Sequence, residues 1–195
     1  MKTTIPAAIL TALVLAGCTA MHSQNPRASF GPVNAVAEGE DARLLLRGAD
    51  VVAYFTQGQH VQGSPQFKSQ FEGVTFRFAS AANKARFDAE PRRYLPQYGG
   101  YCANGIVYAI PWGGDPDRFK IVAGKLYIFG GPGSLAAWNL DEPRNLALAD
   151  KYWKEEVAGS NSFTQRMRRL VFRVPHYKTG ADLARDVEAA KGKRS

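Results

Sequence analysis

The sequence contains few of the residues that bind transition metals or form disulfides. Only two cysteines and three histidines occur among its 195 residues. The histidines, His22, His60 and His176, lie far apart, and no two of them have the i, i+4 spacing of a helical metal pair. A zinc site needs about four Cys, His or carboxylate ligands that converge. The composition therefore argues against a disulfide scaffold and against a structural zinc site.

The sequence also offers no apolar run of the length that spans a bilayer as a helix. Its N-terminal apolar stretch, residues 5–16, has the length of a signal-peptide core. The stretch follows Lys2 and ends in Leu15-Ala16-Gly17-Cys18, which has the form of a bacterial lipobox. This form implies removal of a leader, residues 1–17, and lipidation of Cys18. An uncleaved anchor or an ordinary secretory leader is the alternative.

The residue after the lipobox cysteine indicates where the mature chain lies. Bacterial sorting reserves the inner membrane for lipoproteins with Asp at that position, and Thr19 stands there instead. We therefore expect a lipid-anchored protein of the outer membrane that faces the periplasm. Disulfides are permitted in that compartment, but a lipid on Cys18 would leave Cys102 without a disulfide partner. A lone exported thiol is buried and inert, a metal ligand, or reactive.

The chain carries more positive than negative charge. The formal net charge is +8, and loss of Lys2 with the leader lowers it by one. A basic surface favours anionic partners such as lipid headgroups, lipopolysaccharide or nucleic acid. No recognisable nucleic-acid-binding motif accompanies the charge. We therefore expect the partner to be anionic lipid or an envelope protein, not a nucleic acid.

The patterning divides the chain after the leader into three parts. Residues 18–40 are small, polar and interrupted by Pro and Gly, which is typical of a flexible tether. Residues 41–158 carry the hydrophobic pattern of one folded domain, and residues 159–195 form a basic C-terminal extension. This extension could lie on an anionic surface as an amphipathic element, or dock on the domain by its apolar face.

The domain mixes strands and helices without repeated strand–helix–strand units. Strand-like segments form two pairs, each of which flanks a glycine and predicts a hairpin: 67–71 with 74–78, and 118–122 with 125–129. Helices are expected over 81–89, 134–139, 142–157 and 181–191. A short helix or turn is expected after Asp50, whose carboxylate suits an N-cap. The sequence therefore predicts a small single α+β domain of two β-hairpins with short helices packed around them.

The stretch from Tyr94 to Ala103 concentrates unusual residues. It combines three tyrosines, the pair Gly99-Gly100 and the thiol of Cys102. Glycine pairs let a backbone turn sharply or approach another group closely, and tyrosines supply large buried surfaces with polar ends. The stretch is therefore either a structural hub or a centre of chemistry.

Several motifs resemble those of the exported YHS-domain proteins. The match includes Gly48-Ala49-Asp50-Val51-Val52-Ala53-Tyr54-Phe55, Pro96-Gln97-Tyr98-Gly99-Gly100-Tyr101-Cys102-Ala103 and Gly124-Lys125-Leu126-Tyr127, and it covers about residues 48–155. The resemblance implies a small α+β module. The wider YHS group is related to metal-binding, zinc-finger-like domains, so the resemblance also implies a role in metal handling.

The sequence departs from the metal-binding members of that group. These members usually carry a cysteine-rich start and another cysteine near the middle, whereas Ala79-Ser80 follows the second predicted strand here. A softer site for Cu(I) could use Cys102 with a methionine or with His60. If a transition metal binds, we therefore expect copper rather than zinc, with Cys102 as its ligand.

The candidate ligand-binding residues are Cys102, Tyr101, Tyr98, Asp50, Tyr54 and His60. Structural roles are the alternatives: a small buried thiol, an aromatic core and a helix cap. No acid–base–nucleophile set is visible, which disfavours an enzyme. The sequence predicts a non-enzymatic cell-envelope lipoprotein that binds a metal ion or small ligand near Cys102. The alternative is an envelope interaction protein that contacts anionic membrane or a protein partner through its C-terminal extension.

Overall fold

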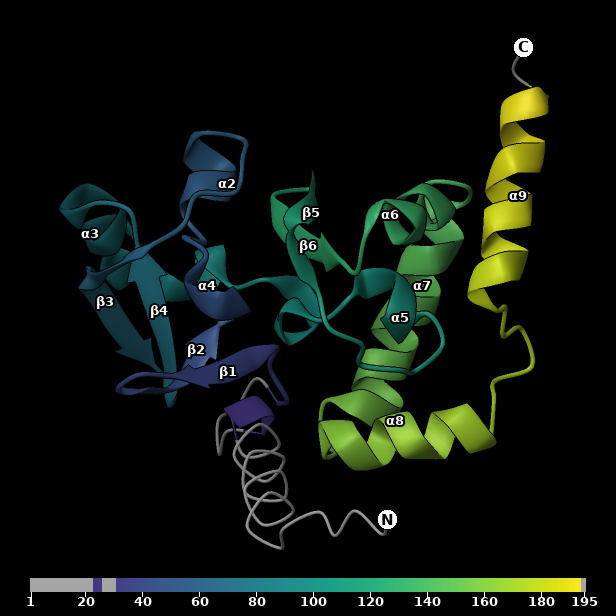
Figure 1. The fold of residues 1–195 in the computed structure, drawn as a ribbon, viewed down its shortest axis with the longest axis horizontal. Coiled ribbons are helices and arrows are strands. Elements are labelled where there is room, and N and C mark those ends of the chain that lie inside the picture. Colours follow the sequence, from purple (N-terminus) through teal and green to yellow (C-terminus); the bar gives the residue numbers. More distant parts are fainter. Residues whose placement is uncertain (1–22, 26–30, 194–195) are drawn as a thin grey trace, which may run out of the picture.

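The structure, a computed structural model, describes residues 23–25 and 31–193. Its strands are β1 Ala35–Glu38, β2 Asp41–Leu45, β3 Ser64–Phe71, β4 Val74–Phe78, β5 Asp115–Val122 and β6 Lys125–Phe129. Its helices are η1 Leu46–Gly48, α2 Ala53–Thr56, α3 Ala81–Ala89, α4 Pro91–Tyr94, η2 Gln97–Gly100, α5 Ala103–Ile106, α6 Pro132–Trp138, α7 Glu142–Tyr152, η3 Trp153–Val157, α8 Ser162–Val171 and α9 Gly180–Gly192 (Figure 1). The predicted leader and the lipidation site Cys18 lie outside the described residues.

The strands form two sheets. The four-stranded sheet has the order β1-β2-β4-β3, in which β3 and β4 form the predicted hairpin and β2 joins β4 in parallel. The second sheet is the predicted hairpin of β5 and β6. Figure 1 shows the larger sheet at one side, the β5–β6 hairpin in the middle, and α5 to α9 at the other side. The α+β class and both predicted hairpins are therefore confirmed.

The folded part of the chain begins earlier than its sequence indicates. The sequence predicts a tether up to residue 40, whereas β1 pairs with β2, and Val33 and Ala35 are buried. The neighbouring Asn34 donates its backbone N–H to the carbonyl of Gly99 and its side-chain amide to the carbonyl of Gly100. This correction has a physical cause: a short segment of small residues carries little periodicity, and its burial comes from residues far along the chain.

Side-chain caps set the starts of several of the longer helices. The Ser80 hydroxyl accepts from the backbone N–H of Asn83 at the start of α3. Asp141 caps α7 in the same way, and Thr179 begins α9 with a reciprocal capping box. None of the helices within the described residues is both long and apolar enough to cross a membrane.

Strand β6 separates two apolar cores. Leu126 and Ile128 belong to the core that the larger sheet encloses, whereas Tyr127 and Phe129 belong to the core beneath the helices α5 to α9. Successive side chains of a strand point to opposite faces, so one short strand contributes to both cores. All four of these side chains are buried.

The stretch predicted to be unusual lies directly along β6. Pro96 forms a parallel bridge with Leu126, and Cys102 forms one with Ile128. Between these two bridges, Gly99 has a φ of +60°, and a Cβ atom there would lie 2.2 Å from the carbonyl oxygen of Pro32. The stretch is therefore a structural hub that ties the N-terminal segment to the central strand.

The C-terminal extension docks on the domain in two ways: Val174, Tyr177 and Leu183 pack against the second core, whereas α8 docks through polar side chains. The Gln165 amide donates to the carbonyl of Ala109, and the Arg166 guanidinium donates to the carbonyl of Pro111. Arg169 forms an ion pair with Glu156. Docking through apolar side chains, one of the two alternatives for this segment, therefore holds for the residues after α8 but not for α8 itself.

We predict that Gly99→Ala lowers the free energy of unfolding by about 3 kcal/mol, because the methyl group adds a backbone clash to the strain of positive φ. Gly124→Ala is the matched control: its φ is +72° and no atom lies within 4 Å of the place that an added methyl group would occupy, so only the φ strain remains. That control should cost about 1 kcal/mol in urea denaturation. Equal losses for the two variants would contradict the close approach at Gly99.

Candidate functional site

Asp50 has a structural role. One carboxylate oxygen accepts the backbone N–H groups of Val52 and Ala53 at 2.9 and 3.2 Å. The other oxygen accepts the backbone N–H of Ala79 and the side-chain amide of Asn83, at 2.8 and 2.7 Å. The side chain is fully buried, so these four donors occupy a carboxylate that has no access to a ligand. The predicted cap is present, and it also joins α2 to the start of α3.

Tyr54 and His60 lie together on the sheet side of the molecule. The Tyr54 hydroxyl donates to the carbonyl of Pro116 at 2.9 Å, and the His60 ring contacts a carboxylate oxygen of Asp117 at 2.8 Å. The two rings stack with their centroids 6.4 Å apart. These contacts join the loop after α2 to the start of β5. His60 does not line the cavity that Cys102 lines.

Tyr98 and Tyr101 belong to the second core. The Tyr98 hydroxyl donates to a carboxylate oxygen of Asp150 at 2.7 Å, and burial together with that carboxylate raises the pKa of Tyr98. Burial raises the pKa of Tyr101 to about 12, although the nearby Arg166 partly opposes this. Both phenols therefore remain neutral near neutral pH and act as packed parts of the core, in which the Tyr98 hydroxyl is held by its hydrogen bond to Asp150.

Cys102 is buried at the edge of the same core. Its backbone N–H donates to the carbonyl of Trp112 at 2.8 Å, and 3% of its surface is exposed. Burial raises the pKa of the Cys102 thiol, and hydrogen bonds from the backbone of Gly105 and Gly130 and from the Ser134 side chain oppose the rise. The thiol is therefore protonated near neutral pH, and its contacts include no base that would activate it.

The surroundings of Cys102 do not fit a transition metal. Across residues 23–25 and 31–193, no group of three His, Cys, Asp or Glu side chains is placed to hold a metal ion. The neighbours of the thiol are backbone amides and a hydroxyl, whereas Cu(I) prefers thiolate, imidazole or thioether ligands and Zn²⁺ prefers thiolate, imidazole or carboxylate ligands. His60, one of the two kinds of second ligand predicted, contacts Asp117 and does not line the cavity beside Cys102.

Cys102 nevertheless lies beside a hollow in the molecule. It lines a cavity of about 110 Å³ together with Trp112 and Ser134. A larger cleft of about 300 Å³ adjoins this cavity. Both hollows are lined by Asn104, Tyr108, Tyr177, Lys178 and Leu183. The two form one site with a wide polar part and a narrow, largely apolar part.

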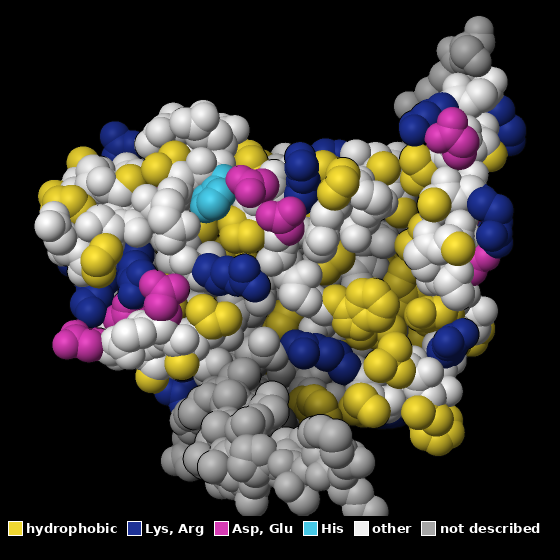
Figure 2. Space-filling view, viewed as in Figure 1, with side chains coloured by type: hydrophobic (Ala, Val, Ile, Leu, Met, Phe, Trp, Pro, Cys, Tyr) yellow, Lys and Arg dark blue, Asp and Glu magenta, His cyan; other side chains and the backbone are white. Residues whose placement is uncertain are grey.

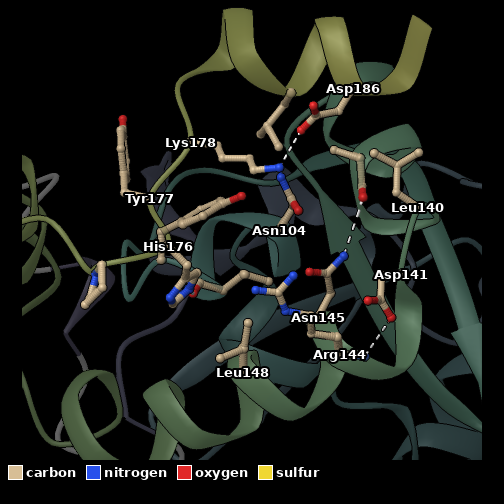
Figure 3. A pocket seen from close by; sticks show the side chains of 15 residues that line it. Asn104, Leu140, Asp141, Arg144, Asn145, Leu148, His176, Tyr177, Lys178 and Asp186 are labelled. Atoms are coloured by element: carbon tan, nitrogen blue, oxygen red, sulfur yellow. Dashed lines mark hydrogen bonds and ion pairs between the residues drawn. The ribbon is translucent and has the colours of Figure 1, made fainter. Parts of the chain in front are cut away.

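Elements far apart in the sequence build the wide part (Figure 3). Asn104 comes from α5, Arg144 and Asn145 come from α7, and His176 and Lys178 come from the segment before α9. The start of α7 is fixed by Asp141, whose carboxylate accepts the backbone N–H of Arg144 at 3.3 Å. The first turn of α7 thus presents Arg144 and Asn145 to the cleft.

Three of these side chains have fixed positions. The Asn145 amide nitrogen donates to the carbonyl of Trp138 at 3.0 Å, which leaves its oxygen available as an acceptor. His176 Nε2 donates to the carbonyl of Val107 at 2.9 Å, so Nε2 carries a proton and Nδ1 remains for other contacts. Lys178 forms an ion pair with Asp186 at 2.6 Å. The cleft therefore has a preformed polar lining.

Arg144 differs from its neighbours in the cleft. Throughout the part of the chain that the structure describes, no hydrogen bond or ion pair engages its guanidinium group. A guanidinium is charged at every accessible pH and matches the geometry of carboxylate and phosphate groups. The cleft thus contains a permanent cation whose hydrogen-bonding capacity is free.

Among the six candidates only Cys102 lines either hollow, and it lines the small cavity that adjoins the cleft. The residues that the sequence analysis missed are Asn104, Arg144, Asn145 and Lys178. Asp141 signals the start of α7, which carries Arg144 and Asn145. Thr179 signals the start of α9, which follows Lys178. Nothing local in the sequence indicates that the first turn of α7 faces residues 176–178, because long-range packing creates that contact.

Comparison with known protein families gives one match. The family model of the YHS domain matches residues 52–98, from the end of the Asp50 cap to η2. No curated protein and no solved structure matches the chain. The matched range contains Tyr54, His60 and Tyr98, and it ends before Cys102 and the residues of the cleft.

The raised pKa of Cys102 makes stability depend on pH. The folded chain holds the thiol proton more tightly than the unfolded chain. The resulting contribution to the free energy of unfolding is therefore complete below the pKa of the unfolded thiol, about 8.5, and is lost as the pH rises above that value. Relative to Cys102→Ala, the wild type should lose up to about 1.4 kcal/mol of unfolding free energy per pH unit in that window. Urea denaturation at several pH values measures the difference, and a constant difference would refute a raised thiol pKa.

Proposed function

We propose that this chain, which carries a YHS domain, is a non-enzymatic binding module that holds a small organic anion in the cleft beside Cys102. The observation that supports this most directly is the Arg144 guanidinium, which lies in the cleft without a carboxylate partner among the described residues. A carboxylate or phosphate group of the ligand would supply that partner through paired N–H···O bonds.

The dimensions and lining of the cleft suit a small ligand. A volume of about 300 Å³ lies at the lower end of the range of small-molecule sites. Tyr108 and Tyr177 provide aromatic walls, and the Asn145 oxygen and His176 Nδ1 provide fixed polar atoms. The apolar cavity beside Cys102 offers room for a short apolar end of the same ligand.

The state of Cys102 favours binding over catalysis. Burial keeps its thiol protonated, and its hydrogen-bonding neighbours are backbone amides and Ser134 rather than a histidine or carboxylate. A nucleophilic cysteine needs a base or a lowered pKa. The thiol therefore serves as one small apolar wall of the site. Metal binding is a role that the YHS family suggests, but the donors around Cys102 do not favour it.

The cellular setting of the proposal comes from the N-terminal sequence. The apolar stretch 5–16 followed by Leu15-Ala16-Gly17-Cys18 supports a lipoprotein that is anchored by Cys18. Thr19 supports the periplasmic face of the outer membrane as its location. A binding module at that position would meet small anions in the periplasm.

Arg144→Gln should weaken binding of the anion about tenfold or more, because it removes a charge-assisted hydrogen-bonding pair. Isothermal titration calorimetry with citrate and with inorganic phosphate as probes measures the affinity. Arg118→Gln, an exposed position on β5, is the matched control with the same change in net charge. Equal weakening in both variants would show that overall charge, not the cleft, attracts the anion. Failure of wild-type protein to bind either probe would refute the anion site as stated.

A further inference from the structure

Helix α8 turns its apolar side towards solvent. Phe163, Met167, Leu170 and Val171 recur at i, i+4, i+7 and i+8, and therefore share one face of the helix. Together with Phe172 they form what we term the α8 apolar face. Each of these five side chains is exposed, and Val171 and Phe172 are both 68% exposed. Figure 2 shows hydrophobic side chains gathered over the region that α8 occupies in Figure 1.

The orientation of α8 is fixed by the polar residues on its other side. Gln165, Arg166 and Arg169 bind the carbonyls of Ala109 and Pro111 and the carboxylate of Glu156. A helix on the surface of a domain ordinarily buries its apolar stripe against the core. Here the polar side is packed and the apolar side is exposed among the described residues, so the exposed face is a feature of the fold. A contiguous exposed apolar face of this kind marks an interaction surface.

The N-terminal segment meets the start of this helix. The Asn25 side chain accepts from the backbone N–H of Ser162 at 2.9 Å, and the Gln24 side chain accepts from the Arg166 guanidinium at 2.6 Å. Cys18 precedes Asn25 by seven residues, which span at most about 25 Å when fully extended. A lipid on Cys18 would therefore hold Asn25, which contacts the start of α8, within about 25 Å of a bilayer surface.

Basic residues accompany the apolar face. The side chain of Arg168 is 58% exposed and lies 3.9 Å from Glu156, which also pairs with Arg169. Arg173 follows the end of α8 with its guanidinium over the Tyr177 ring. An apolar helical face with arginines beside it is the composition of helices that lie in the interface of anionic membranes. Arginine stems also lie along apolar surface while their charged ends reach the headgroups.

We propose that the α8 apolar face lies in the boundary between headgroups and acyl chains of an anionic bilayer, held there by the nearby lipid anchor. This contact orients the domain on the membrane instead of leaving it free on a tether. The proposal does not depend on the anion site, because no residue of the α8 apolar face lines that cleft. A second copy of the chain and a protein partner are the competing occupants.

Vesicle flotation tests the contact with the chain from residue 18 onward, which contains every described residue, carrying Cys18→Ser so that no lipid contributes. The probes are vesicles of phosphatidylethanolamine with phosphatidylglycerol, and neutral vesicles of phosphatidylcholine. The protein with an unchanged α8 apolar face should bind the anionic vesicles more tightly than the neutral ones. Phe172→Ser should weaken binding about tenfold. Ile121→Ser is the matched control, because Ile121 is an exposed apolar side chain on β5, and its binding should equal that of the wild type.

The outcomes separate the possible occupants. Loss of binding in Phe172→Ser alone supports the membrane contact. Absence of vesicle binding by the wild type, or equal binding by Phe172→Ser, overturns it. A concentration-dependent dimer in analytical ultracentrifugation that Phe172→Ser abolishes, without vesicle binding, would assign the face to a second copy of the chain and would also overturn the proposal. Circular dichroism of each variant checks that the fold is retained.

Discussion

The structure depends on one short strand that belongs to two cores. Alternate side chains of β6 enter the core of the larger sheet and the core beneath the helices, so neither core is complete without it. The stretch from Pro96 to Cys102 pairs with this strand at both of its ends, and Gly99 allows the N-terminal segment to pass at backbone distance. Strand β6 therefore fixes the position of the cleft relative to residues 52–98, which match the YHS domain.

The same constraint explains why the cleft lies where it does. Cys102 ends the stretch along β6, and α5 begins at the next residue. The chain then returns through α7 and residues 176–178, which place Arg144 and Lys178 opposite Asn104. The YHS match, residues 52–98, covers part of the larger sheet and ends within the stretch along β6, whereas β6 itself and the polar groups of the cleft come from the chain beyond the match. The proposed function therefore belongs to the C-terminal part of this particular chain.

Local patterns predicted much of the fold and little of the site. The strand-like segments 67–71 and 74–78, the glycines between paired strands and the cap at Asp50 are short-range signals, and the structure confirms those elements. The strand β1 and the polar docking of α8 depend on contacts between distant segments, which periodicity does not report. Periodicity gives the residues that share a face of α8, but not which face is packed. For the same reason the sequence pointed to the thiol of Cys102 and missed the free guanidinium of Arg144.

The central claim is that the cleft between α5, α7 and the segment before α9 holds a small anion. The most direct measurement is a ¹⁵N-resolved NMR titration of the protein with citrate, which follows backbone and side-chain resonances together. The account predicts saturable shifts centred on Asn104, Arg144, Asn145 and Lys178, with the Arg144 guanidinium resonance among those that move most. Shifts centred on His60 and Asp117, with the residues of the cleft unchanged, would contradict it.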